Sequence, residues 1–115
     1  MHELSIALSI VDGVLEEAGR HGTGQVEVVY VRVGRLSGVD KDALLFSYRV
    51  ACGDTPLVNS RLEIEDVEVV IHCPQCQGER TLRSFPLLIC DDCGSAANRV
   101  VHGDELEISR LEIAA

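Results

Sequence analysis

Four cysteines arranged as two C-x-x-C pairs are the residues of this sequence best suited to chemistry. Cys73 and Cys76 form the first pair, Cys90 and Cys93 form the second, and 13 residues separate the pairs. Each pair can turn tightly around one metal ion, and two such turns complete a tetrahedral site of four thiolates. The spacing therefore predicts a zinc ribbon. Because four sulfurs close the coordination shell, we expect the zinc to be structural and not catalytic.

The glycines beside the pairs fit this interpretation. Gly78 follows Cys76 by two residues and Gly94 follows Cys93 directly, where a chain folding back past a metal often needs a positive φ. Two other interpretations remain open, namely a pair of redox dithiols and a rubredoxin-like iron site.

Composition narrows the class of protein. The 115 residues include 19 acidic and 10 basic side chains, and the net charge of −9 argues against binding nucleic acid. Five cysteines, of which only Cys52 lies outside the pairs, indicate a reducing compartment, so we expect a cytoplasmic protein. No apolar stretch approaches the length of a membrane span. The nucleotide-binding, hydrolase and metalloprotease motifs are absent, so we do not expect an enzyme.

Apolar periodicity predicts two helices. Leu4, Leu8, Val11 and Leu15 recur at helical spacing from almost the first residue. Gly19, then Gly22 and Gly24, are expected to stop this helix. The second helix is expected to start at Asp40, an N-cap residue type, and to end at Gly53 and Pro56.

Three further stretches predict strands. Residues 26–33 are rich in β-branched side chains, 62–71 alternate but slip in phase at Asp66, and 106–113 alternate with a similar slip. We expect an α+β fold, with two helices packed on a small three-stranded sheet that the last strand rejoins. The zinc ribbon would then be an inserted module at residues 68–103.

His2 is the sharpest candidate for a second metal site. Its ring nitrogen, its own backbone nitrogen and an adjacent main-chain nitrogen can form chelate rings around a square-planar Ni(II) or Cu(II) ion. The alternative is an exposed terminal residue without a ligand. Glu3 is an acid of the first helical turn, and Asp40 caps the second helix unless the two helix starts lie together, in which case it could add an oxygen donor.

The remaining histidines and Cys52 have simpler interpretations. His72 and His102 flank the ribbon as solvated strand-end residues, with replacement of a zinc-bound cysteine as the alternative. His21 is expected in an exposed glycine-rich loop. Cys52 is expected to be a buried small apolar residue at a helix end.

Three motifs together give a resemblance that covers essentially the whole chain. The start Met1-His2-Glu3-Leu4-Ser5, the turn Gly34-Arg35-Leu36-Ser37-Gly38-Val39 and the two C-x-x-C pairs resemble the HypA/HybF family of hydrogenase maturation nickel chaperones. The resemblance implies a nickel-binding α/β domain at residues 1–67 and 104–115 and a zinc-binding domain at 68–103.

The same resemblance implies roles for individual residues and partners. His2 matches the nickel ligand, the main chain of Met1 and Glu3 completes the coordination, Glu3 also tunes it, and Asp40 falls where some members have an acidic donor. Cys73, Cys76, Cys90 and Cys93 match the ligands of structural Zn(II), while Ni(II) is transient cargo. The implied partners are a maturation GTPase of the HypB type and the large subunit of [NiFe] hydrogenase, with a homodimer as one oligomeric option and no nucleic acid or membrane. The alternative function is a zinc-ribbon adaptor that transfers no nickel.

Overall fold

The computed structural model describes most of the chain, and contacts divide it into two compact units. The described residues are 2–22, 24–85 and 87–114. The first unit takes the described residues of 1–31, 39–65 and 107–115, and the second takes those of 32–38 and 66–106. The fold is α+β, as the sequence predicts.

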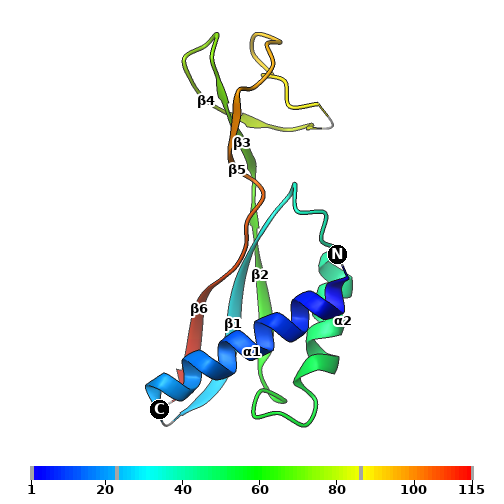
Figure 1. Ribbon diagram of the computed structural model, residues 1–115, viewed down its shortest axis with the longest axis vertical. Coiled ribbons are helices and arrows are strands. Elements are labelled where there is room, and N and C mark those ends of the chain that lie inside the picture. Colours follow the sequence, from blue (N-terminus) through cyan, green and yellow to red (C-terminus); the bar gives the residue numbers. More distant parts are fainter. Residues whose placement is uncertain (1, 23, 86, 115) are drawn as a thin grey trace. The chain divides into compact units, whose positions relative to one another are not determined.

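The first unit has two helices against one face of a three-stranded sheet (Figure 1). Its elements are α1 (Glu3–His21), β1 (Gln25–Gly34), α2 (Lys41–Cys52), β2 (Arg61–Val67) and β6 (Leu106–Ala114). The strand order is β2-β1-β6, so the last strand joins the first sheet as expected. Valines of β1 are buried on both faces of the strand, which fits its central position.

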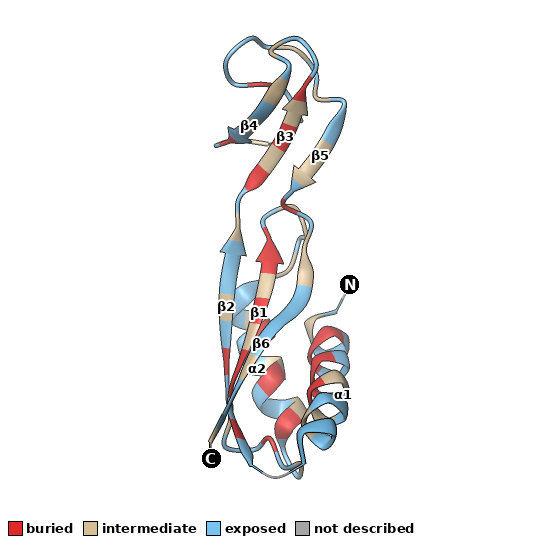
Figure 2. Cartoon of the chain, turned by 90° about the vertical axis from the view of Figure 1, so that its left-hand side faces the viewer, coloured by how far each residue is buried: buried red, intermediate tan, exposed pale blue. Residues whose placement is uncertain are grey.

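Helix α1 is amphipathic, but its buried stripe is narrower than the sequence predicts. Figure 2 shows its buried residues on the side facing the sheet. The buried side chains are Ile6, Ala7, Ile10, Val11 and Val14, whereas Leu4 and Leu8 are exposed. Gly19 does not stop the helix, since glycine inside a helix costs only about 1 kcal/mol and Arg20 supports the last turn through Glu16 and Glu17. The helix ends at Gly22, where φ is 84°.

Helix α2 begins and ends where the sequence predicts. The Asp40 carboxylate accepts a hydrogen bond from the backbone N–H of Ala43 at 3.1 Å, and Gly53 is the C-cap. Tyr48 is buried, which raises the pKa of its phenol, and its hydroxyl lies 2.7 Å from that of Ser60. Cys52, the last helical residue, is buried as expected.

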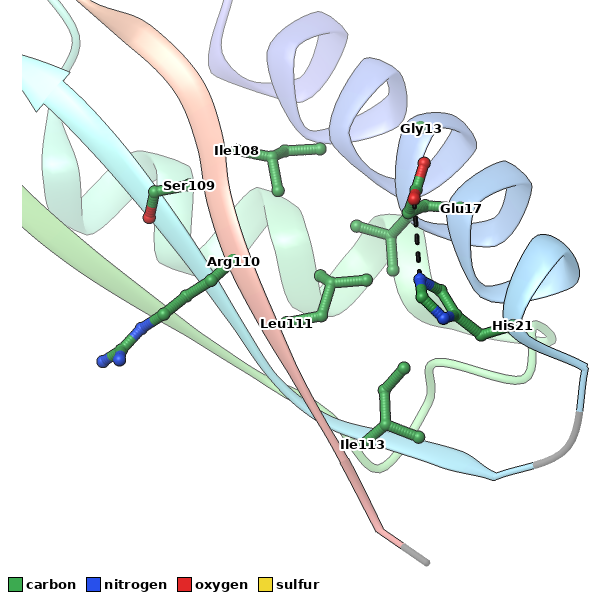
Figure 3. A pocket seen from close by; sticks show the side chains of 9 residues that line it. Gly13, Glu17, His21, Ile108, Ser109, Arg110, Leu111 and Ile113 are labelled. Carbon is green, nitrogen blue, oxygen red and sulfur yellow. Dashed lines mark ion pairs between the residues drawn. The ribbon is translucent and has the colours of Figure 1, made fainter.

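Strand β6 shows the predicted slip in phase. Ile108 and Ile113 point towards α1, whereas Ser109 and Arg110 point away from it (Figure 3). Arg110 instead lies over the ring of Tyr30, 3.9 Å from its centroid. The slip gives β6 an apolar side against α1 and a polar side on the open face of the sheet.

The second unit is a small antiparallel sheet with the order β4-β3-β5. Its strands are β3 (Val69–Cys73), β4 (Gly78–Leu82) and β5 (Arg99–His102). The predicted break between two strands falls at Glu68, which separates β2 from β3. Strand β3 leads directly to Cys73, so it carries the first cysteine pair.

The turn at residues 34–38 belongs to this second unit. Leu36 donates its backbone N–H to the carbonyl of Gly103 at 2.7 Å, and its side chain contacts the buried cluster of the unit. Gly34 donates to the carbonyl of Glu105 at 2.7 Å. A Cβ at Gly34 would lie 2.0 Å from the Gly103 carbonyl oxygen. The turn therefore requires glycine at position 34 because two backbones meet there.

None of the helices in the described ranges is long and apolar enough to cross a membrane.

Two glycine substitutions should have opposite effects. We expect Gly34→Ala to lower the free energy of unfolding by about 1–3 kcal/mol or more, because the new methyl group meets backbone that cannot easily move. Gly19→Ala is the matched control: it lies inside α1 with open space around it, and should raise stability by up to about 1 kcal/mol. Urea denaturation followed by circular dichroism measures both. Equal stability of the two variants would contradict the close backbone contact.

Candidate metal centre

The four cysteines converge on one point in the second unit. Their sulfur atoms all lie within 4.8 Å of one another. The Cys73 and Cys93 sulfurs are 3.4 Å apart, and those of Cys76 and Cys90 are 3.9 Å apart. Four sulfurs placed about 2.3 Å from a tetrahedral centre would be about 3.8 Å from one another. The arrangement therefore fits a tetrahedral ion such as zinc.

Each cysteine pair sits on a similar turn. The backbone N–H of Cys76 points to the Cys73 sulfur at 3.4 Å, and the N–H of Gly94 donates to the carbonyl of Cys90 at 2.9 Å. The residue after each pair has a positive φ, 56° at Gln77 and 76° at Gly94. The expectation of a positive φ at Gly78 is therefore wrong, because the reversal happens one residue earlier and Gly78 already begins β4.

The site is continuous with the hydrophobic core of its unit. The buried cluster consists of Val69, Ile71, Cys73, Leu82 and Cys90, so two of the four sulfur ligands belong to it. Phe85 and Leu88, from the segment between the two pairs, contact this cluster, and so does Leu36 from the distant turn. Cys93 is exposed and Cys76 is half-buried. The ligands thus span the unit from its core to its surface.

The four thiols hold their protons unequally. Hydrogen bonds to the Cys93 and Cys73 sulfurs raise the pKa of Cys76 to about 12, because its proton is shared with its neighbours. Hydrogen bonds from the side chain and backbone of Ser95 lower the pKa of Cys93 to about 6. A divalent metal must displace all of these protons to bind four thiolates, so binding weakens as pH falls.

Arg80 supplies positive charge beside the cysteines. The pKa of its guanidinium is raised, chiefly by the charge of the Cys76 thiolate, and its Nε lies 2.8 Å from Asp92 Oδ2. A dication held by four thiolates carries a net charge of −2, which a nearby cation stabilises. The sequence analysis missed Arg80 and Ser95, because only the strand pairing and the second turn bring them to the site.

The histidines that flank the ribbon are engaged elsewhere. His72 Nδ1 lies 2.9 Å from Asn98 Oδ1, and His102 Nδ1 lies 2.9 Å from Glu105 Oε2. Burial alone would raise the pKa of Glu105, but hydrogen bonds from the Gly103 N–H and from His102 outweigh it and lower that pKa. Neither histidine belongs to the four-cysteine group.

The candidate residues of the N-terminal site lie at two adjacent helix starts in the first unit. His2 is the exposed N-cap of α1, with an extended backbone and no side-chain capping bond. A carboxylate oxygen of Glu3 accepts a hydrogen bond from the backbone N–H of Asp40, the N-cap of α2, at 3.2 Å. Met1 lies outside the described residues. Within those residues, His2, Glu3 and Asp40 do not form a second convergent group of side-chain ligands.

His21 is the last residue of α1 and not part of a glycine loop, although it is exposed as expected. Its Nε2 lies 3.6 Å from Glu17 Oε1. The two side chains line a hollow of about 480 Å³ between α1 and β6, in which the remaining lining is mostly apolar (Figure 3).

The fold and the site define a small α+β protein with a four-cysteine cluster whose geometry could hold a metal ion. Comparison with known proteins identifies its family. A family model described as "Hydrogenase/urease nickel incorporation, metallochaperone, hypA" matches residues 1–113. The chain therefore belongs to the HypA family of nickel-incorporation metallochaperones.

Individual relatives agree with this assignment. The chain is 46% identical over 112 residues to the hydrogenase maturation factor HypA of Chloroflexus aggregans, covering 97% of this chain and 98% of that protein. The corresponding protein of Roseiflexus sp. is 45% identical over 112 residues, with coverages of 97% and 91%.

A solved structure shares the fold. The solution structure of the Ni metallochaperone HypA from Helicobacter pylori matches with a TM-score of 0.70 at 24% identity, covering 100% of this chain and 99% of that one. At this identity the likeness concerns the fold alone.

The charge of Arg80 should contribute to metal retention. We expect Arg80→Gln to lower metal affinity about ten-fold, the lower end of the effects seen when residues around metal ligands are changed. Arg83→Gln is the matched control, because it makes the same charge change in the same unit, where only the backbone of Arg83 bonds to the second turn. Competition between the protein and a chelator for Co²⁺, followed by the absorption of the tetrahedral thiolate complex, measures both affinities. An equal loss in the two variants would contradict a specific role for Arg80.

Proposed function

We propose that this protein is a nickel metallochaperone that binds Ni(II) at its N-terminal helix start and delivers it for maturation of [NiFe] hydrogenase. One observation carries the proposal within a family of nickel-incorporation proteins: an exposed histidine stands at the start of α1, where backbone nitrogens have no helical acceptor. The first backbone hydrogen bond of α1 runs from the Ile6 N–H to the His2 carbonyl, at 3.2 Å. Nitrogen atoms before Ile6 have no acceptor within the helix.

This position suits the proposed ligands. The ring of His2 and the backbone nitrogens of His2 and Glu3 can bind Ni(II) without breaking any hydrogen bond of the helix ladder. The main chain of Met1 is the remaining proposed donor. Because the start of a helix carries partial positive charge, a cation there needs nearby negative charge, and Glu3 and Asp40 provide it. Glu3 thus tunes the site, and Asp40 is the weakest of the proposed donors, because its carboxylate caps α2.

The proposed nickel site also suits release of the metal. Its residues lie at an exposed helix end, which opens at little cost in free energy. Since protons compete for the same nitrogens, nickel binding weakens as pH falls.

In this proposal the four cysteines hold a structural Zn(II). Thiolates in a closed tetrahedral shell favour zinc, and the nitrogen-rich site favours nickel, so each metal has its own ligands. The protein performs no catalysis. Its partners are a GTPase of the HypB type and the large subunit of [NiFe] hydrogenase, which it meets in the cytoplasm.

Substitution of His2 tests the nickel site. We expect His2→Ala to abolish stoichiometric nickel binding while zinc content and the circular dichroism spectrum stay unchanged, because the side chain of His2 makes no capping bond. His21→Ala is the matched control, since it removes an exposed histidine from the other end of α1. Isothermal titration with Ni²⁺ measures both variants. Nickel binding retained by His2→Ala, or lost equally in His21→Ala, would reject this site and leave a zinc-ribbon adaptor as the better account.

Substitution of single cysteines tests the zinc site. Cys73→Ser should lose zinc and the structure of the second unit, because Cys73 is both a ligand and part of the buried cluster. Cys52→Ser should keep one zinc per chain, since Cys52 is buried in the first unit and does not belong to the four-cysteine group. Metal analysis by mass spectrometry and heteronuclear NMR spectra report the two properties. Full zinc content in Cys73→Ser would contradict the four-thiolate site.

A further inference from the structure

Cys93 is the most accessible residue of the four-cysteine group. Cys73 and Cys90 are buried and Cys76 is half-buried, whereas Cys93 is exposed. The other residues of its turn are exposed as well, and a Cβ built on Gly94 would have open space around it. Because a thiolate reacts with dissolved reagents only where they can reach it, Cys93 is the sulfur that a small molecule from solvent meets first.

A buried partner lies close to this exposed sulfur. The sulfurs of Cys73 and Cys93 are 3.4 Å apart, whereas those of Cys76 and Cys90 are 3.9 Å apart. A disulfide bond is about 2.0 Å long, so the sulfurs of Cys73 and Cys93 need to approach each other by only about 1.4 Å. Cys73 is therefore well placed to react with a modified Cys93.

Charge around the second turn selects the kind of reagent. Asp91 and Asp92 directly precede Cys93 and are both exposed, and Arg80 pairs with Asp92 only. The chain as a whole carries a net charge of −9. Anionic oxidants such as hypochlorite or oxidised glutathione are repelled from such a surface, whereas hydrogen peroxide is small and uncharged. Peroxide is thus the oxidant that this turn admits best.

We propose that the four-cysteine site is a site of reversible oxidation, at which hydrogen peroxide joins Cys93 to Cys73 and releases the zinc. This inference rests on the zinc site of the proposed function. The Cys93 thiolate attacks one peroxide oxygen, and the O–O bond breaks to give a sulfenic acid and a hydroxide ion. The Cys73 thiolate then attacks the Cys93 sulfur, so that the S–S bond forms and a second hydroxide leaves. Two protons from water neutralise the hydroxides; the two sulfurs lose two electrons and the peroxide gains them.

Formation of this disulfide removes half of the zinc ligands. Only the thiolates of Cys76 and Cys90 remain, and two thiolates hold zinc far more weakly than a closed shell of four. Since Cys73 also belongs to the buried cluster, loss of the metal loosens the packing of the second unit. A dithiol reductant regenerates the thiolates, after which zinc can bind again.

Zinc release and disulfide mapping test the proposal on the full zinc-loaded chain. Zinc content is measured by mass spectrometry before any oxidant is added. Hydrogen peroxide is then added, and a chromogenic chelator records the zinc that is released. Samples taken at low conversion are alkylated and mapped by peptide mass spectrometry, before disulfides can exchange. We expect zinc release to accompany a disulfide between Cys73 and Cys93 as the first product, and dithiothreitol with added zinc to reverse both changes.

A conservative variant tests the order of attack. Ser95 donates hydrogen bonds from its side chain and backbone to the Cys93 sulfur. A hydrogen bond to a thiolate engages the electron pair that attacks peroxide, so Ser95→Ala should release zinc about two- to three-fold faster. Ser84→Ala is the matched control, because it makes the same change at an exposed serine of the same unit. Cys52→Ser should also release zinc at the unchanged rate, since Cys52 is buried and lies outside the four-cysteine group.

Three results would overturn the proposal. One is a zinc-loaded chain that keeps its zinc in excess peroxide. Another is a first product in which Cys93 is unmodified, or in which the disulfide lies within one C-x-x-C pair. The third is zinc release at the same rate from Ser95→Ala and Ser84→Ala. A chain that holds no zinc before oxidation would instead refute the zinc site of the proposed function, so the two failures are distinguishable.

Discussion

The convergence of four thiolates is the constraint on which the second unit depends. Sulfur atoms that lie within 4.8 Å of one another can all be charged only if a cation lies between them. Two of these sulfurs, those of Cys73 and Cys90, also belong to the buried cluster of five residues. A core this small cannot offset the conformational entropy of the unit by itself, so we expect metal binding and folding of the unit to be coupled.

The turn at residues 34–38 is held by the same unit through different interactions. Leu36 contacts the buried cluster, while Gly34 and Leu36 bond to the backbone near Gly103. The motif Gly34-Arg35-Leu36-Ser37-Gly38 is thus explained by structure: glycine because backbones meet there, and leucine because it completes a core. Nothing in this geometry requires the motif to bind a ligand.

The proposed nickel site differs from the four-cysteine site in its exposure and in how close its residues lie in the sequence. The candidate metal centre of the second unit would use sulfur atoms from two turns, some of them buried, whereas His2 is exposed and lies next in sequence to the first backbone nitrogens of α1. A closed shell of four sulfur ligands suits a permanent ion, and an exposed helix start suits an ion that must leave. The hydrogen bond from the Asp40 backbone N–H to the Glu3 carboxylate, at 3.2 Å, joins the starts of both helices, so the start of α1 has a defined neighbour.

Local patterns predicted much of this structure. The cysteine spacing, the N-cap at Asp40 and a break between two strands close to Asp66 are encoded within a few residues. The convergence of the cysteines and the N-cap are confirmed, and the break falls two residues after Asp66, at Glu68. Two local predictions were wrong because neighbouring residues could serve equally well. The helix continues past Gly19 to Gly22, supported by the ion pair between Arg20 and Glu16, and the positive φ after Cys76 falls on Gln77 instead of Gly78. Arg80 beside the sulfurs and Gly103 against Gly34 could not be predicted, because they depend on strand register and on contacts between distant segments.

The central claim is that two metals have separate ligands in one chain, and metal counting under native conditions tests it most directly. Native mass spectrometry should find one zinc in the purified protein, and one zinc plus one nickel after nickel loading. A chain extended by residues placed before Met1 should keep its zinc and take up no nickel. Nickel that displaces the zinc, or that binds the extended chain equally well, would contradict the account.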